Sequence, residues 1–283
     1  MKLAVLFERY LVEFPRASVV KRSILRRLKD DSLGRKKAPG TARDYIDLCR
    51  ARREECAPQT VLYYVMAVRD VLAYAKPGWG LSEVTDAPIR EAFPILKKEG
   101  LIGGSRRRQR RPTNEETLSI LEYFRARGDL LMVDIVEFQN DSTRRIGETC
   151  RLRWGDVDLP TKTILVLNMK HPTRKNNHNR VALPDKSVEI IQRQPRNSSH
   201  PDERIFKVKS RTASVKYARA VHDLGIPDLH LHDCRRGGTT KLLEEGRSVW
   251  EVMLVTGHER PDLPLTTYNA LQAEDFHKMR RAA

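Results

Sequence analysis

The chain has few cysteines, no long hydrophobic run and no nucleotide-binding motif. Its four cysteines, among 283 residues, form no CxxC pair and have no histidine at zinc-finger spacing, so neither a structural zinc site nor a disulfide framework is expected. The longest apolar stretches, such as residues 130–136, are far shorter than the ~20 residues that cross a bilayer. No GxxxxGK[ST] sequence is present, which argues against a P-loop. We therefore expect no metal, no cofactor and no membrane partner.

The first residues begin like a secretory signal, but charged residues interrupt the pattern. Glu8 and Arg9 break the apolar segment after a few residues, and no small-residue cleavage site follows. The sequence therefore predicts a soluble cytoplasmic chain that keeps its N-terminus.

Positive charge is in excess and is unevenly distributed. The chain holds 53 Lys and Arg against 37 Asp and Glu, a formal charge of +16. Residues 1–112 hold 25 basic and 13 acidic residues, a net of +12, and residues 113–283 hold 28 and 24, a net of +4. Such an excess of positive charge is typical of proteins that bind a polyanion, and nucleic acid is the first partner to consider.

A segment rich in glycine and arginine separates two parts of the chain. The sequence GGSRRRQRRPTNEET at residues 103–117 offers little to bury. We place a domain at residues 1–102, a linker at 103–112 and a second domain at 113–283. The arginine run is read either as a solvated linker or as a segment that lies against phosphates, and both readings can hold together. Its members are Arg106, Arg107, Arg108, Arg110 and Arg111.

Apolar periodicity predicts helices throughout the first domain, which we expect to be a small all-α bundle. Ser18, Thr41 and Ser82 precede apolar runs at positions typical of N-caps.

The second domain is predicted to be α+β and mainly helical. Thr113 and Glu116 form a capping-box pattern that opens a helix to about Arg127. Two strands, 161–170 and 179–184, flank a basic hairpin loop. The other helices are expected at 129–138, 145–154, 186–194, 212–224, 233–245, 249–257 and near 265–271.

Four stretches of the second domain carry residues suited to phosphate chemistry. They are STRRIGETCRLRW from residue 142, the hairpin with Lys170, LHDCRRGG from residue 231, and VTGHERPDLPLTTY from residue 255. Each has an ordinary explanation when taken alone, such as a helical salt bridge, a solvated edge lysine or a core aromatic. Their order along the chain is what makes the combination specific.

The set resembles the tyrosine recombinases, the phage-integrase family. The likeness is closest over residues 145–154 and 231–268, and the first domain is similar to the helical, SAM-like core-binding domain of these integrases. The resemblance implies that Arg145, Lys170, His232, Arg235, His258 and Tyr268 are catalytic, and that Glu148 supports the first arginine. In this sequence Thr143 and Arg144 stand where family members commonly carry a hydrophobic or Gly-Leu pair.

The sequence leaves some assignments open. The hairpin loop is long, so Lys170 is favoured over Lys175 as the site lysine without excluding Lys175. Arg174 and Lys175 are further candidates for DNA contact, together with the five linker arginines.

The residue types suit attack on a phosphodiester without a metal. Negative charge develops on the non-bridging oxygens when phosphorus becomes five-coordinate, and two guanidinium groups can stabilise that charge. Tyr268 would be the nucleophile, His232 its proton acceptor and the hairpin lysine the acid that protonates the leaving 5′ oxygen. His258 would donate a hydrogen bond to a phosphate oxygen. A 3′-phosphotyrosyl bond conserves the phosphodiester energy, so ATP is not required.

The resemblance implies a bacterial or phage-encoded, DNA-associated site-specific recombinase. Its partner would be double-stranded DNA, on which a homotetramer assembles, with room for accessory DNA-bending proteins. Two alternatives remain: DNA relaxation in the manner of a type IB topoisomerase, and a catalytically silent DNA-binding protein of the same fold.

Overall fold

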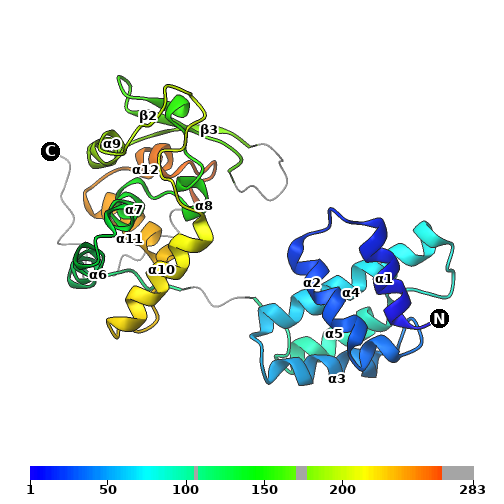
Figure 1. Cartoon of the computed structure of the whole chain (residues 1–283). Coiled ribbons are helices and arrows are strands. Elements are labelled where there is room, and N and C mark those ends of the chain that lie inside the picture. The colour runs from blue at the N-terminus through cyan, green and yellow to red at the C-terminus, as the bar shows by residue number, and fades with distance from the viewer. Residues whose placement is uncertain (105–107, 170–176, 263–283) are drawn as a thin grey trace. The chain divides into compact units, whose positions relative to one another are not determined.

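The computed structural model of the chain describes residues 1–104, 108–169 and 177–262. The chain divides into two compact units, residues 1–106 and 107–283 (Figure 1). Each unit has its own hydrophobic core. Across the described residues, no helix has the length and apolar character that a membrane span requires.

The first unit is built from helices, as the periodicity predicts. They are α1 (Leu3–Glu13), α2 (Val19–Asp30), the 3-10 helix η1 (Leu33–Arg35), α3 (Ala42–Arg53), α4 (Pro58–Trp79) and α5 (Ala87–Lys98). Ser18 caps α2, and Thr41 caps α3, so these two N-cap predictions are confirmed. The prediction for Ser82 is wrong. Helix α5 begins five residues later, after Asp86, because Ser82 lies in a turn that the Val84 N–H closes onto the Leu81 carbonyl at 3.0 Å.

The second unit is α+β and mainly helical, which confirms the predicted fold class. Its elements are α6 (Asn114–Ala126), α7 (Leu130–Ser142), α8 (Ile146–Thr149), the 3-10 helix η2 (Trp154–Asp156), β1 (Val157–Asp158), β2 (Thr163–Val166), β3 (Asn179–Ala182), α9 (Asp185–Gln192), α10 (Ser210–Asp223), α11 (Leu231–Glu244) and α12 (Val249–Thr256). The Thr113–Glu116 capping box is present at the start of α6. The helix expected near 265–271 lies outside the described residues.

A small antiparallel sheet with strand order β1-β2-β3 lies at one end of this unit, beside α9 and α12 (Figure 1). Ile164 pairs with Val157 on one side and with Val181 on the other. Ile164, Val166 and Val181 are buried, as the two-residue period of a strand requires. The predicted hairpin is present with shorter strands, and β1 adds a third strand that the sequence pattern did not indicate.

The predicted helix over 145–154 is wrong beyond Thr149. Helix α8 ends there, and the following backbone pairs with a distant segment instead of continuing the helix. The Trp154 N–H donates to the Glu203 carbonyl at 3.0 Å, and the Ile205 N–H donates to the Leu152 carbonyl at 3.0 Å. These long-range bonds satisfy the backbone groups that a helix would have used.

Helix α11 packs closely on α7 because it carries a glycine at the contact. A Cβ built on Gly238 would lie 2.1 Å from the Asn140 carbonyl oxygen, whereas one on the neighbouring Gly237 would lie 3.3 Å from a side-chain atom of Pro112. The close approach bears on the candidate site because α11 also carries His232 and Arg235.

We expect Gly238→Ala to lower the free energy of unfolding by about 1–3 kcal/mol, since the two helices must separate to accept the methyl group. Gly237→Ala is the matched control, with a helix-propensity gain that offsets a mild contact. Denaturant unfolding of both variants measures the difference. Equal stability of the two variants would contradict this account of the helix contact.

Candidate active site

Arg145 and Glu148 form a reciprocal pair at the start of α8. The Arg145 guanidinium Nη1 donates to Glu148 Oε1 at 2.8 Å, and the Arg145 backbone N–H donates to Glu148 Oε2 at 3.2 Å. Glu148 is 3% exposed and Arg145 26% exposed. Burial by itself would raise the pKa of Glu148, but the charges of Arg144, Arg145 and Arg235 hold that pKa below its ordinary value. Glu148 is therefore an anion that orients Arg145.

Arg235 lies at the centre of the cluster and is fully buried. Its Nη1 donates to the carbonyl of Thr143, and its Nη2 lies 2.9 Å from His258 Nε2. One guanidinium thus joins the turn before Arg145 to the segment that follows α12.

His258 is held as a neutral imidazole with a defined tautomer. Gly257 ends α12 in the left-handed region, with φ 70°, and this turn brings His258 back toward Arg235. Because arginine cannot accept a hydrogen bond, His258 Nε2 must be the acceptor, and Nδ1–H then donates to Thr256 Oγ1 at 2.8 Å. Burial, followed by the charges of Arg235, Arg145 and Arg144, lowers the pKa of His258 to about 3.

This arrangement differs from the hydrogen bond to phosphate that the resemblance implied for His258. In the structure Nε2 accepts from Arg235, so the ring positions a guanidinium. Donation to a phosphate stays a prediction and requires a change of partner at Nε2.

His232 lies at the more open side of the same cluster. Desolvation of the ring, then the charges of Arg235 and Arg145, lower its pKa. A neutral imidazole near two guanidinium groups can accept a proton from an incoming hydroxyl.

The structure therefore brings together Arg145, Glu148, His232, Arg235 and His258, five of the seven residues assigned to the site from the sequence. The other two, Lys170 and Tyr268, lie outside the described residues, as do Arg106, Arg107, Arg174 and Lys175 among those expected to contact DNA. The residues that are brought together come from the start of α8, the first turns of α11 and the end of α12. They form a compact, positively charged group with one buried carboxylate.

Two buried residues beside this group were not assigned a role from the sequence. Arg144 is 0% exposed, although a basic residue in a basic stretch is expected at the surface. Thr143 lies in the left-handed region with φ 56°, which costs a β-branched residue about 1–2 kcal/mol. The only sequence signal was their departure from the pair that the family commonly carries.

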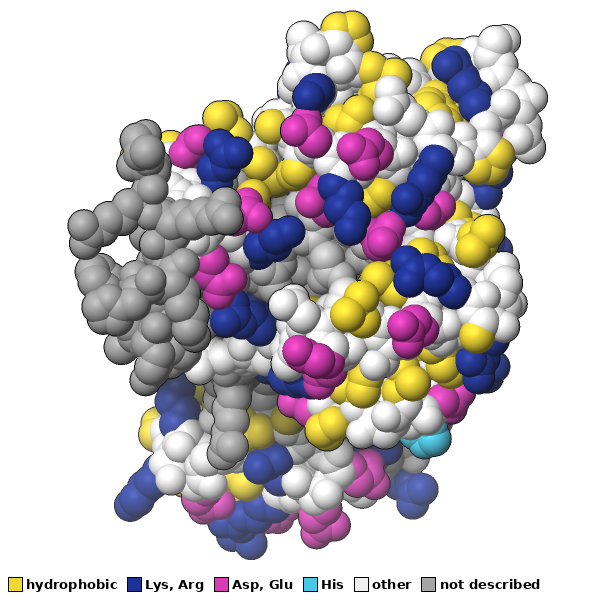
Figure 2. Space-filling model, turned by 90° about the vertical axis from the view of Figure 1, so that its left-hand side faces the viewer, with side chains coloured by type: hydrophobic (Ala, Val, Ile, Leu, Met, Phe, Trp, Pro, Cys, Tyr) yellow, Lys and Arg dark blue, Asp and Glu magenta, His cyan; other side chains and the backbone are white. Residues whose placement is uncertain are grey.

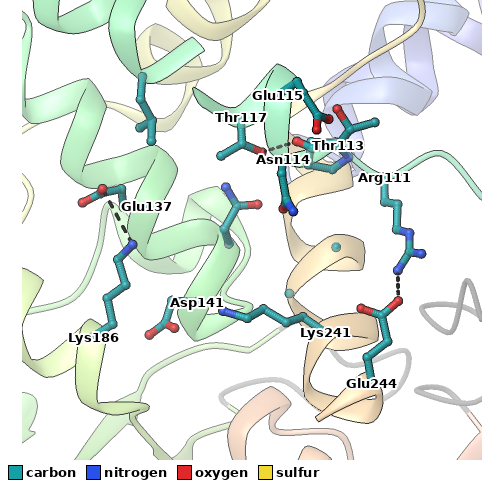
Figure 3. Close-up of a pocket in the computed structure, with 15 residues that line it drawn as sticks. Arg111, Thr113, Asn114, Glu115, Thr117, Glu137, Asp141, Lys186, Lys241 and Glu244 are labelled. Atoms are coloured by element: carbon teal, nitrogen blue, oxygen red, sulfur yellow. Dashed lines mark hydrogen bonds and ion pairs between the residues drawn. The ribbon is translucent and has the colours of Figure 1, made fainter. Parts of the chain in front are cut away.

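Three linker arginines form ion pairs within the second unit. Arg108 bonds to Asp228 and to the buried Asp233 at 2.6 and 2.9 Å. Arg110 pairs with Glu116, and Arg111 reaches Glu244 at 2.5 Å (Figure 3). Arg108 and Arg111 thus contact opposite ends of α11. Their predicted role in DNA contact is untested, and these carboxylates would compete with phosphates for the same guanidinium groups.

A hollow of about 550 Å³ lies between α6, α7 and α11 (Figure 3). Basic and acidic groups line it together, including Lys186, Glu137, Lys241 and Glu244, and none of the cluster residues does. Basic and acidic side chains are also interspersed on the face of the molecule in Figure 2. Among the residues that the structure describes, neither feature offers the continuous positive surface that a phosphate backbone favours. Over the described ranges, no three His, Cys, Asp or Glu side chains gather closely enough to hold a metal ion.

Comparison with known proteins gives a consistent family and fold. Residues 111–275, more than half of the chain, match the phage integrase family. The shufflon-specific DNA recombinase of Escherichia coli is 27% identical over 216 residues, which cover 76% of this chain and 51% of that protein. The chain thus spans about half the length of this curated relative.

Solved structures share the fold at low sequence identity. The Tn1549 transposon integrase, in complex with transposon right end DNA, superposes with a TM-score of 0.70 at 12% identity and covers 98% of both chains. A lambda integrase tetramer bound to a Holliday junction gives a TM-score of 0.70 at 15% identity, over 92% of this chain and 78% of that chain. These likenesses establish the fold.

Proposed function

The chain belongs to the phage integrase family, the tyrosine recombinases, and from this premise we propose that it is a site-specific DNA recombinase that cleaves and rejoins duplex DNA through a 3′-phosphotyrosyl intermediate. The observation that carries the proposal is the buried cluster in which Arg235 joins the Arg145 turn to His258. The cluster residues occur in the family's order along the chain.

The two arginines are proposed to bind the scissile phosphate. Arg145 remains 26% exposed while Glu148 fixes its guanidinium, so its donors are oriented before the substrate arrives. Arg235 supplies a second charge from the buried side. Preorganised donors of this kind stabilise charge that develops in the transition state without reorganising.

Tyr268 is proposed as the nucleophile. Its phenolic oxygen bonds to phosphorus, the bond from phosphorus to the 5′ oxygen breaks, and the 5′ oxygen leaves with a proton. The neutral ring of His232 is suited to take the phenolic proton, and Lys170 or Lys175 to protonate the leaving oxygen. Return attack by a 5′ hydroxyl reverses these steps and reseals the strand.

The proposed partners follow from the relatives. Duplex DNA is the substrate, and a homotetramer on DNA is the proposed assembly, as in the lambda integrase tetramer on a Holliday junction. We propose a cytoplasmic, DNA-associated location. The five linker arginines, Arg174 and Lys175 are retained as proposed DNA contacts.

The experiment is an in vitro joining assay on the full chain. Two separately labelled duplexes, each carrying a repeat from the DNA that flanks the gene, are incubated with the protein in EDTA, and a supercoiled plasmid with the same repeats is incubated in parallel. We expect joined products between the two duplexes. Relaxation of the plasmid without joining would indicate a topoisomerase, and specific binding without any covalent adduct would indicate a silent DNA-binding protein.

A further inference from the structure

Arg144 is a buried cation that is poorly compensated. Its Nε donates to the Ser142 carbonyl at 3.2 Å, and its Nη2 donates to the Val255 carbonyl. Its Nη1 is buried and has no hydrogen-bond partner among the described residues. Burial, followed by repulsion from Arg235, lowers the pKa of Arg144 to about 9 against the favourable charge of Glu148.

An apolar side chain would occupy this position at lower cost. Removing a charge from water without a close counter-ion is unfavourable, and well-packed hydrophobic residues often replace buried ions with no loss of stability. Stability of the fold therefore does not explain why the chain carries arginine here.

The hydrogen bonds of Arg144 join two segments that both contribute to the cluster. Ser142 ends α7, immediately before the turn that leads to Arg145, and Val255 lies in the last turn of α12, three residues before His258. Arg235 makes a parallel connection between the same segments, from the Thr143 carbonyl to His258 and, at 3.5 Å, to the Thr256 carbonyl. Two buried guanidinium groups thus hold the end of α12 against the Arg145 turn.

Arg144 also sets the charge of the cluster. With Arg144, Arg145 and Arg235 positive, Glu148 negative and His258 neutral, the formal charge is +2. A hydrophobic residue at position 144 would reduce it to +1. A five-coordinate phosphate bears more negative charge than the ground-state diester, so the additional positive charge favours the transition state.

We propose that Arg144 is a positioning residue of this active site, which fixes the end of α12, and with it His258, against the turn that carries Arg145. Its effect on cleavage rests on the proposed function, whereas its effect on His258 does not. We assign Arg144 no contact with the reacting phosphate, because its Nε and Nη2 bond to the backbone carbonyls of Ser142 and Val255.

The test uses the full chain with Arg144→Leu, Arg144→Lys and the double variant Thr143→Gly/Arg144→Leu, which restores the pair that the family commonly carries. Arg193→Leu is the matched control, because it removes an exposed cation that pairs with Asp134 and Glu137. For each protein we would measure the ¹⁵N NMR titration of His258 without DNA, the thermal midpoint, the DNA dissociation constant, and the rate of covalent adduct formation at saturating DNA.

For Arg144→Leu we expect the pKa of His258 to rise, because one of the three positive charges that lower it is removed. The rate of covalent adduct formation should fall about 10-fold to 100-fold, as misplaced catalytic groups cause, with DNA affinity within about twofold. The thermal midpoint should change little, because removal of a buried charge offsets the loss of the donor to the Ser142 and Val255 carbonyls. Arg144→Lys keeps the charge but replaces the planar fork, whose Nε and Nη2 donate to two separate carbonyls, by a single flexible ammonium group. It should leave the pKa of His258 low and still slow the reaction.

The double variant separates positioning from packing. It removes the strained Thr143 backbone and places an apolar side chain at position 144. It should therefore be more stable than Arg144→Leu and still form the covalent adduct slowly. A double variant with the wild-type rate and an unchanged His258 titration would overturn the proposal. If the leucine variants do not fold, Arg144→Met provides the same comparison with a flexible side chain. If the wild-type chain itself forms no adduct, the proposed function fails, and the DNA-free titration still decides the role of Arg144.

Discussion

Replacing Arg145 by alanine is expected to slow DNA cleavage by about 100-fold or more, as loss of a preorganised oxyanion donor does. Folding should lose only about 1 kcal/mol, because Glu148 Oε1 loses a partly exposed donor but Oε2 keeps the backbone N–H of residue 145, and the charges of Arg144 and Arg235 remain. The measurement is single-turnover formation of the covalent adduct at saturating DNA, alongside denaturant unfolding. Arg145→Lys should restore little of the rate, since lysine lacks the planar fork that binds two phosphate oxygens.

Arg235→Ala provides an informative contrast because Arg235 has two roles in the structure. It should slow cleavage by a similar factor and also destabilise the fold, since the buried Thr143 carbonyl and His258 Nε2 lose their donor. An unpaired buried acceptor costs about 1–3 kcal/mol. If Arg145→Ala lost stability and retained the cleavage rate, the Arg145–Glu148 pair would be a structural salt bridge and the assignment of the site would fail.

Local sequence signals predicted much of the fold. The caps at Ser18, Thr41 and Thr113 and the apolar periodicity identified the helices because these signals act over one or two turns. The failures arose where distant segments determine the structure. Residues 150–154 have a helical pattern, but their backbone pairs with the segment around Glu203. Strand β1 has two residues, too few for a periodic pattern.

The candidate site was inferred from the sequence for a different reason. The spacing of an arginine, an HxxR pair and a later histidine carries the family signal even where the local structure was misjudged, as for α8. The burial of Arg144 could not be predicted, because it depends on the close packing of α7, α11 and α12. Gly238 makes one of these contacts possible, and no local pattern around position 144 encodes it.

Tyr268→Phe is expected to abolish the covalent protein–DNA adduct completely. The substitution removes the oxygen that forms the bond to phosphorus and leaves the ring and every positive charge of the cluster in place. Specific DNA binding should survive, because it depends on charges and contacts that the change does not touch.

The adduct also reports how that oxygen reacts. In the wild-type reaction the protein should be attached to the 3′ side of the nick, with a free 5′ hydroxyl. The adduct should form in EDTA, because Arg145 and Arg235 would stabilise the negative charge that a metal ion stabilises in other enzymes. A phenol has an ordinary pKa of about 10, so adduct formation should accelerate with rising pH until the phenolic proton is no longer limiting. An adduct that persists in Tyr268→Phe would assign the nucleophile to another residue. Because the cluster around Arg235 is described independently of Tyr268, that result would relocate the attacking oxygen while leaving the proposed phosphate-binding site intact.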